Sequence, residues 1–276
     1  PNDIESVTVL KDASASIYVS RSANGVILVK TNRGIKGKPS INYSYNVGLQ
    51  SPTRLPELTD AATYAQVLNE IEIFAGLSAL YTDAEVQKFK DGSDPINYPN
   101  TDWYAETLSK MAFQQKHNIS FRGANDQVAY YVGGGFSNQD GIYKKSSTNY
   151  KQYEVRSNID AKITKSFTLS VDLSGRIEDQ HYSGESSGDI FWLLTRSFPT
   201  QLARYPNGLP TYGMDMGNPV TMVTDETGYR NYVKNIFNGT ITAKLDLPWI
   251  TPGLSVDGNI ALDKIGEDRK DWHTPS

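Results

Sequence analysis

The sequence predicts a mostly β fold, in which a short α/β unit precedes about seven antiparallel strands of a partial transmembrane β-barrel. Three observations predict it: residues alternate with a period of two from Ser40 onward, most strands run about ten residues, and short and long connections alternate. Turns that are short on one rim and long on the other are typical of a membrane barrel, whereas a soluble sandwich has no reason to follow this rule.

The first part of the chain lacks this membrane pattern. Val7–Leu10 and Gly25–Thr31 are short apolar runs of the buried-strand type, and Lys11–Ser16 between them is a helical turn of small residues. The segment Asn32–Pro39 (NRGIKGKP) has the composition of a linker. We therefore expect a compact strand–helix–strand unit that leads into the barrel.

The strands show one apolar and one polar face. In Tyr153–Ile163 the odd positions are mostly apolar and the even positions polar, and Phe167–Ile177 repeats the pattern. We predict that these apolar side chains share one uncovered face of a curved sheet: Tyr153, Val155, Ile159, Phe167, Leu169, Val171 and Leu173. The same rule predicts five further strands, at Ile41–Leu49, Lys116–Arg122, Val128–Phe136, Tyr232–Leu247 and Leu254–Asp263.

The connections between these strands fall into two classes. The short ones are Gly123–Gln127, Thr164–Ser166 and Pro248–Gly253. The long ones are Gln50–Gln115, Ser137–Asn149 and Glu178–Asn231. Long connections that carry their own structure usually carry function.

Helix signals occur within the first long connection. Thr59 is a candidate N-cap for a helix with Ala61, Tyr64, Ala65, Leu68 and Ile71 on one face. Thr82 and Glu85 form a capping box, with Val86 and Phe89 expected to be buried and Gly92 as the stop signal. A third short helix is expected to begin at Asn100 or Thr101 and to run through Leu108.

Composition excludes several functional classes. The net charge is −4 with both signs interspersed, so no basic footprint for nucleic acid is present. The absence of cysteine excludes disulfides and thiolate metal sites. No apolar run approaches the roughly 18 residues of a transmembrane helix. No signal peptide is visible, and both ends look like cuts, so we expect an internal piece of a longer protein.

Acidic and histidine residues do not form a convincing catalytic or metal site. Glu178, Asp179, His181, Glu185 and Asp189 cluster after a predicted strand, where a solvated loop is favoured over the facing carboxylates of a glycosidase. The three histidines lie far apart in the sequence, and Asp91–Asp94 favours a turn over a calcium site. We therefore predict neither an enzyme nor a bound metal or cofactor.

The N-terminal segment carries a family resemblance. Asp3–Gly34, which is DIESVTVLKDASASIYVSRSANGVILVKTNRG, resembles the end of the plug domain in TonB-linked outer-membrane transporters of the SusC/RagA type. The KGKP linker and the later motifs SPT.LP, NTDWY, NQDGIYKKS and LSGRIED extend the similarity over nearly the whole chain. The resemblance divides the chain into plug end (1–34), linker (35–40) and first barrel strands with their extracellular loops (41–276). Val19 departs from the family pattern, which usually has glycine there, and puts the shape of that loop in doubt.

The resemblance implies a function and partners. Members of the family import large nutrients, usually oligosaccharides and sometimes peptides, across the outer membrane of Gram-negative bacteria. TonB supplies energy through the plug, here through an N-terminal part that the chain lacks, and a SusD-like surface lipoprotein forms a lid. If the plug lies on the periplasmic side, the first strand runs outward, the short connections are periplasmic turns and the long ones are extracellular. The sequence leaves the substrate open.

Candidate site residues follow from the polar strand faces and the loops. The polar residues expected to line a substrate path or contact the plug are Glu154, Arg156, Asn158, Asp172 and Arg176. We expect the plug segment to touch inward residues such as Arg156 or Arg176, and Trp103 and Trp192 to anchor a lid or substrate in the loops. Aromatic residues near strand ends are expected to meet outer-membrane lipid. Two other classes remain open: a soluble β-rich carbohydrate-binding module and a glycan-cleaving enzyme.

Overall fold

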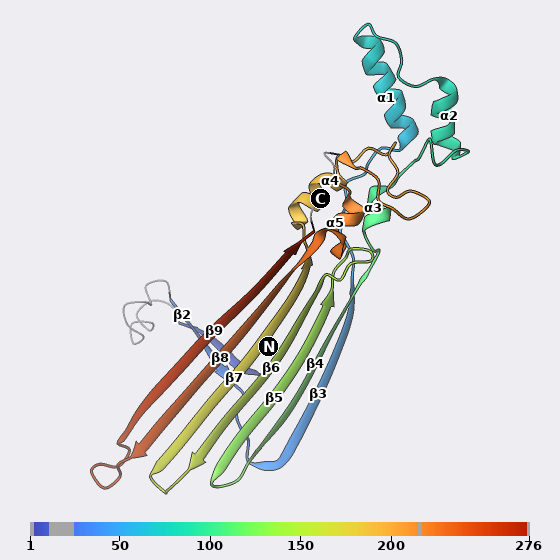
Figure 1. The fold of residues 1–276 in the computed structure, drawn as a ribbon. Coiled ribbons are helices and arrows are strands. Elements are labelled where there is room, and N and C mark those ends of the chain that lie inside the picture. Colours follow the sequence, from blue (N-terminus) through green and yellow to red (C-terminus); the bar gives the residue numbers. More distant parts are fainter. Residues whose placement is uncertain (1–2, 11–24, 215–216, 275–276) are drawn as a thin grey trace.

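The computed structural model describes residues 3–10, 25–214 and 217–274. Strands β1 (Ile4–Leu10) and β2 (Val26–Thr31) pair as a two-stranded antiparallel sheet. A second sheet of seven strands forms the body of the molecule (Figure 1). None of the described helices is both long and apolar enough to cross a membrane. The helical turn expected at Lys11–Ser16 and the loop around Val19 lie outside the described residues.

The seven strands follow one another as an antiparallel meander, as the sequence predicted. Their bounds are β3 Gly37–Gln50, β4 Ala112–Ala124, β5 Val128–Asp140, β6 Asn149–Lys162, β7 Phe167–Ser183, β8 Gly228–Asp246 and β9 Ser255–His273. They run 13 to 19 residues and so exceed the predicted length; β9 continues to His273 although its predicted end was Asp263. Backbone pairing continues beyond the apolar stretch, where polar side chains pair instead, as Lys234 does with Glu267 at 3.0 Å.

The predicted apolar face is confirmed by the strand register. Ile159 lies opposite Val171 and Ala161 opposite Leu169, so odd positions of β6 and β7 point to the same side. This outer face is uncovered by the described parts of the chain: Tyr153 is 47% exposed and Val155 59% exposed. This apolar face is therefore not packed against a second sheet, as it would be in a soluble β-sandwich.

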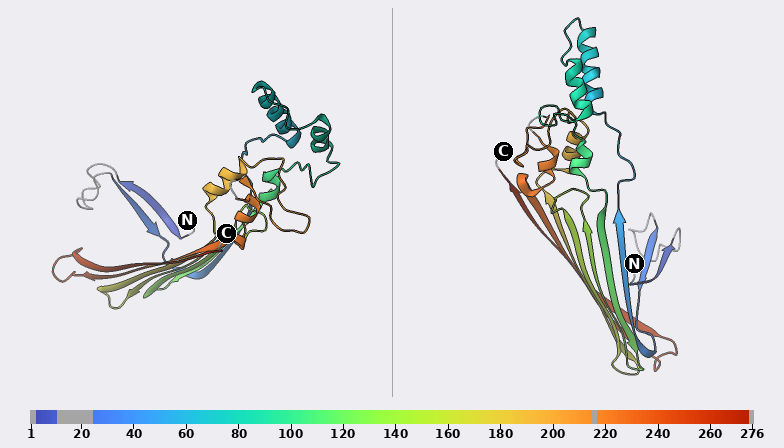
Figure 2. Two further views of the ribbon diagram at one scale, coloured as in Figure 1. Left: turned by 45° about the horizontal axis from the view of Figure 1, so that its top comes forward. Right: turned by 90° about the vertical axis from the view of Figure 1, so that its right-hand side faces the viewer.

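The β1–β2 sheet lies over the opposite, concave face of the large sheet (Figure 2). Its apolar side chains were expected to be buried, but Val7 is 56% exposed and Ile27 67% exposed. The reason is that the β1–β2 sheet meets the large sheet at one end and stands away from it elsewhere. Strand β3 begins at Gly37, so the last four of the six residues of the predicted linker 35–40 are already strand.

The two classes of connection separate to opposite ends of the sheet (Figure 1), but the predicted strict alternation of length holds only in part, because connections 141–148 and 247–254 have the same length. Short turns at 125–127, 163–166 and 247–254 lie at one end, and long connections at 51–111 and 184–227 lie at the other. The remaining connection at the loop end, 141–148, is shorter than the predicted Ser137–Asn149, because β5 continues to Asp140.

Two helices of the first long connection form an arm that projects from the loop end (Figure 1). Helix α1 (Ala61–Phe74) is capped by Asp60, which accepts from the Thr63 N–H at 3.0 Å, and not by the predicted Thr59. Helix α2 (Asp83–Asp91) has the predicted capping box of Thr82 and Glu85 and ends at Gly92 with φ 65°. The expected burial of Val86 and Phe89 is confirmed, but Ile71 on α1 is 56% exposed.

The remaining helices form a second packed unit at the loop end. They are α3 (Trp103–Thr107), α4 (Ser187–Leu194), α5 (Pro219–Met222) and the 3₁₀ helix η3 (Asp225–Thr227). Asp102 caps α3, slightly later than the predicted start. We call the buried cluster that joins these elements the loop core, which comprises Trp103, Tyr104, Leu108, Ile190, Leu193, Leu194, Ala203, Val220, Met222 and Val223.

Candidate functional site

The inner, concave face of the sheet is polar where the outer face is apolar. The five polar residues nominated from the sequence lie on even positions of β6 and β7 and therefore on this inner face. The register places Glu154 opposite Arg176 and Asn158 opposite Asp172. Their roles in a substrate path remain a proposal, but three of them, Arg156, Asn158 and Asp172, contact the β1–β2 sheet or the residues that flank it.

Arg33 joins the segment after β2 to the inner face. Its guanidinium donates to Asp160 on β6 at 2.9 Å and to Asp172 on β7 at 2.6 Å. All three side chains are about one-third exposed, and Asp160 also accepts from Ser170 at 2.6 Å. One planar cation thus bridges two adjacent strands, a geometry to which a guanidinium is well suited.

Asn158 and Asp3 make further contacts at the same place. Asn158 is fully buried, and its amide donates to the Asn32 carbonyl at 2.7 Å and to the Thr31 hydroxyl at 3.1 Å. Asp3 accepts from the Tyr131 hydroxyl at 2.5 Å and lies 3.5 Å from Arg156 Nε, near the long end of ion-pair distances. We call the set that joins the two sheets the inner-face site, formed by Asp3, Arg33, Tyr131, Arg156, Asn158, Asp160 and Asp172.

Two of the five polar residues predicted for a substrate path pair with other residues on the inner face. Arg176 pairs with Glu178 on its own strand at 2.9 Å, and Glu154 accepts from Gln152 at 3.0 Å. The sequence pattern placed Asp160 and Asp172 on the polar face of the strands. It did not identify Arg33 as the cation that pairs with them. Nothing local in the sequence identifies that cation, which is 127 and 139 residues away.

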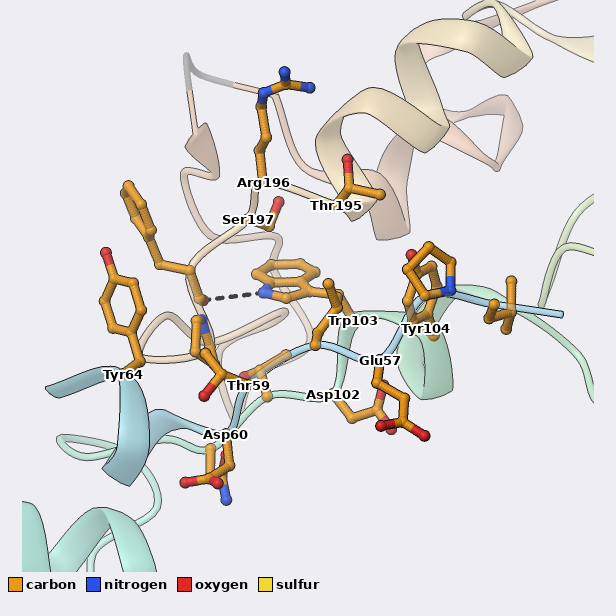
Figure 3. Close-up of a pocket in the computed structure, with 17 residues that line it drawn as sticks. Glu57, Thr59, Asp60, Tyr64, Asp102, Trp103, Tyr104, Thr195, Arg196 and Ser197 are labelled. Atoms are coloured by element: carbon orange, nitrogen blue, oxygen red, sulfur yellow. Dashed lines mark hydrogen bonds between the residues drawn. The ribbon is translucent and has the colours of Figure 1, made fainter. Parts of the chain in front are cut away.

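A cavity of about 760 Å³ opens between the arm and the loop core (Figure 3). Three chain segments form it: residues 55–64, 100–104 and 195–199. Side chains of the middle segment hold them together, since Asn100 accepts from the Ala61 N–H at 3.0 Å and the Thr101 hydroxyl donates to the Gln201 carbonyl at 2.6 Å. The ring centroids of Tyr64 and Phe198 lie 5.7 Å apart on one side of the cavity, with the rings tilted by 33° to each other.

Aromatic and charged groups meet in this cavity. Trp103, at its centre, is 1% exposed and donates from Nε1 to the Phe198 carbonyl at 3.0 Å (Figure 3). At the rim, the Thr63 N–H lowers the pKa of the Asp60 carboxyl below its usual value. Burial raises the pKa of Tyr104. Aromatic surface beside hydrogen-bonding groups suits the binding of a ligand or a partner segment.

The two tryptophans nominated as anchors differ. Trp103 is buried in the loop core, so the expectation that it grips a lid or substrate does not fit its position; its indole packs the loops instead. Trp192 on α4 is 42% exposed and carries the Arg196 guanidinium 4.6 Å from its ring. Its role at a surface contact stays a proposal.

The acidic cluster after Arg176 is used for structure. Glu178 pairs with Arg176, the Asp189 carboxylate accepts from the Ser186 hydroxyl at the start of α4, and His181 contacts Asn231 and Asp225. Among the residues that the structure describes, no group of three or more acidic or histidine side chains is arranged to hold a metal ion.

Comparison with known proteins gives consistent relatives. No family model matches the chain. TonB-dependent receptor P3 of Formosa agariphila is 30% identical over 83% of the chain and 22% of its own length. TonB-dependent receptor SusC of Bacteroides thetaiotaomicron is 31% identical over 58% of the chain and 14% of its own length. The chain thus spans about a fifth or less of these relatives.

Solved structures give the same fold. The structure of the RagAB peptide transporter matches all of the chain and 33% of its own chain, with a TM-score of 0.73 and 22% identity. The RagAB peptide importer in its closed-closed state matches with a TM-score of 0.72. The seven strands are therefore part of a transmembrane β-barrel wall. Taken together with the curated relatives, these matches show that the chain belongs to the TonB-dependent receptors of the SusC/RagA type.

Proposed function

We propose that the protein containing this chain imports large nutrients across the outer membrane of a Gram-negative bacterium and that TonB energises the transport. In this proposal, β3–β9 form part of the barrel wall and β1–β2 form the end of the plug. The relatives support it, because they are named TonB-dependent receptors and one solved neighbour is a peptide importer. An oligosaccharide or a peptide is the proposed cargo.

The two faces of the wall carry this proposal. The outer face presents exposed apolar side chains, such as Ile41 at 67% and Ile260 at 78%, which need an apolar surrounding. The inner face holds the β1–β2 sheet through Arg33 and Asn158. A wall with lipid outside and a polar plug inside has this distribution of side chains, and a soluble binding module does not.

A SusD-like surface lipoprotein is the proposed partner of the long loops, with the short turns on the periplasmic side. The arm and the exposed Trp192 offer apolar surface at the loop end. TonB is proposed to act through a part of the protein outside this chain. The glycan-cleaving alternative is not favoured, because Glu178 and Asp189 are committed to an ion pair and a helix cap.

Deletion of the full-length gene tests the transport proposal. Growth on the cognate glycan or peptide should be lost, and growth on the corresponding monosaccharide or amino acids should be unchanged. A plasmid copy should restore growth. If deletion leaves growth on every glycan and peptide tested unchanged, the import proposal is wrong.

Cysteine labelling tests the proposed orientation, since the chain has no cysteine of its own. Ser93→Cys and Ser187→Cys lie in the long connections, and Ser166→Cys lies in a short turn. A thiol reagent that does not cross the outer membrane should label the first two on intact cells and Ser166→Cys only after permeabilisation. The reverse labelling would invert the topology.

Substitution of Trp192 tests the loop contact. We expect Trp192→Ala in the full-length protein to reduce co-purification of the lipoprotein or uptake, with the amount of assembled barrel unchanged. Trp249→Ala is the matched control, because Trp249 is 63% exposed in the short turn at the opposite end. If Trp192→Ala and Trp249→Ala give the same co-purification and uptake, Trp192 is not part of the contact.

A further inference from the structure

A groove of about 790 Å³ crosses the outer face of the wall from β5 to β9. The register brings one outward residue from each of these strands into a row along it. The row consists of Gly134, Val155, Gly175, Phe237 and Lys264. The groove therefore lies on the apolar face, on the side of the wall opposite the inner-face site.

Glycines without a backbone role form part of the floor of this groove. A side-chain carbon on Gly175 or on Gly266 would meet no atom within 4 Å, and neither residue has a positive φ. Packing and backbone conformation therefore do not require glycine at these positions. The missing side chains leave space beside Tyr153 and Phe237, which also line the groove and are 47% and 42% exposed. Apolar space of this width suits a flexible hydrocarbon chain.

Lys264 lies at the border of the apolar band on β9. The outward residues Ile260 and Leu262 before it are apolar, and Lys264 is the first outward cation on the way to the loop end. On β8 and β7 the first polar outward residues are Asn235 and Asp179, which lie in adjacent rows of the same register. These residues mark the level at which the apolar band meets the lipid head groups.

Lys264 is also a cation without a protein partner among the described residues. Lys234 differs, because it points to the inner face and pairs with Glu267 at 3.0 Å. An ammonium at the level of the head groups attracts an anionic lipid. The border is on the loop side of the band, and in the proposed orientation this is the outer leaflet, which in Gram-negative bacteria consists of phosphorylated glycolipid.

We infer that the groove binds a phosphorylated glycolipid of the outer leaflet, with a phosphate at the Lys264 ammonium and an acyl chain along the glycine floor. Charge and shape act together here, so this lipid stays bound when the surrounding lipid exchanges. The inference rests on the proposed orientation of the barrel and not on the import of nutrients.

Removal of the charge provides the first test. Full-length protein in phosphatidylcholine vesicles that contain lipid A should keep lipid A through detergent extraction, as counted by mass spectrometry. We expect Lys264→Gln to keep about fivefold less, the effect of losing one cation at a lipid surface, and Lys264→Arg to keep the native amount. Lys165→Gln is the matched control, because Lys165 is exposed in the short turn at the opposite end.

Three results of this test would overturn the inference. The first is equal retention of lipid A by Lys264→Gln and Lys165→Gln. The second is equal retention of lipid A from which the phosphate has been removed. The third is that phosphatidylglycerol, offered in place of lipid A, is retained as well as lipid A.

Filling the groove provides the second test and leaves the charge of Lys264 in place. We expect Gly175→Leu to lower the retention of lipid A by a similar factor, because the new side chain occupies the path of the acyl chain. Gly258→Leu is the matched control, since Gly258 faces the same side of β9 outside the groove and its side-chain carbon would also meet no atom within 4 Å. Native retention by Gly175→Leu, at equal amounts of assembled barrel, would overturn the inference.

These measurements are independent of the import proposal. A deletion strain without any growth defect would overturn import and leave the lipid retention of the purified protein unchanged. Reversed labelling of Ser93→Cys and Ser166→Cys would instead place the groove in the inner leaflet and overturn the assignment of a glycolipid.

Discussion

The wall and the loop core are both rich in apolar residues, but they use them in opposite ways. On the wall, Val155 and Ile260 are 59% and 78% exposed, and the strands are held by continuous backbone pairing. In the loop core, Trp103 and Leu194 are 1% and 0% exposed. The wall requires an apolar surrounding from outside the chain, whereas the loop core excludes water with its own side chains.

This difference determines which substitutions are costly. Truncating a buried side chain leaves a cavity, whereas truncating an outward side chain on the wall leaves space that lipid can fill. Introducing a charge has the opposite pattern of costs: the charge is tolerated where water reaches the side chain and is costly where lipid surrounds it. The two regions should therefore respond in opposite order to truncation and to charge.

Truncation in the loop core should have the largest effect. We expect Trp103→Ala to destabilise the loop end by about 3–5 kcal/mol, because it removes a buried indole and leaves the Phe198 carbonyl without its donor. Leu173→Ala on the outer wall, where Leu173 is 40% exposed, should cost far less. Protease sensitivity of residues 184–227 in the assembled protein measures the difference. If the two variants resist the protease equally, the proposed difference between the loop core and the outer wall is wrong.

Charge on the outer wall should have the next largest effect. We expect Leu173→Arg to destabilise the assembled barrel by about 2–4 kcal/mol, the range for arginine facing the middle of a bilayer. Ser174→Arg is the control at the neighbouring position, where the side chain points to the polar inner face and its hydroxyl contacts Asn238. Unfolding in urea from lipid vesicles measures both. If the control loses more stability than Leu173→Arg, the assignment of the faces is wrong.

The strands of the wall were predictable because the residue pattern that specifies them lies within each strand and the adjacent short turn. Alternation in Tyr153–Ile163 and Phe167–Ile177 specifies which residues share a face, and the adjacent register follows from the short turns. Strand ends were less predictable, since β9 pairs with β8 up to His273 after the apolar alternation has ended. Backbone pairing there depends on the neighbouring strand and not on the residue pattern.

The site and the loop core depended on distant contacts and were predicted in part. The polar positions on β6 and β7 followed from periodicity, but the choice of Arg33 as their cation did not, because it joins segments far apart in the sequence. Trp103 was nominated as an anchor because it is an aromatic residue in a long loop; its burial depends on α4 and α5, which are contributed by another connection. Capping signals gave α2 correctly, whereas α4, with Ser186 as its cap, was missed.

A buried polar residue on the inner wall should give a smaller effect than either change above. We expect Asn158→Ala to cost about 1–3 kcal/mol, because the Asn32 carbonyl loses a buried donor. Asn259→Ala on the exposed strand β9 is the control and should be close to neutral. Hydrogen exchange at residues 31–36 measures the effect locally. Unchanged protection there would mean that Asn158 does not help to hold the plug end.

The smallest effect is expected at the start of α2, on the arm. Thr82→Ala removes half of the capping box and should cost about 1 kcal/mol of local stability, with exposed Ser78→Ala as the control. The Thr82 N–H and hydroxyl, followed by the Tyr98 hydroxyl, hold the pKa of the Glu85 carboxyl below its usual value of 4.5. A folded-state pKa that is lowered gives stability that is present above pH 4.5 and is lost as the pH falls through the lowered value. The protection of the α2 amides against hydrogen exchange, measured relative to the intrinsic exchange rate at each pH, should therefore fall at acidic pH in the native protein, and less so in Glu85→Gln. An equal fall in protection in both would show that the Glu85 carboxylate does not stabilise the arm.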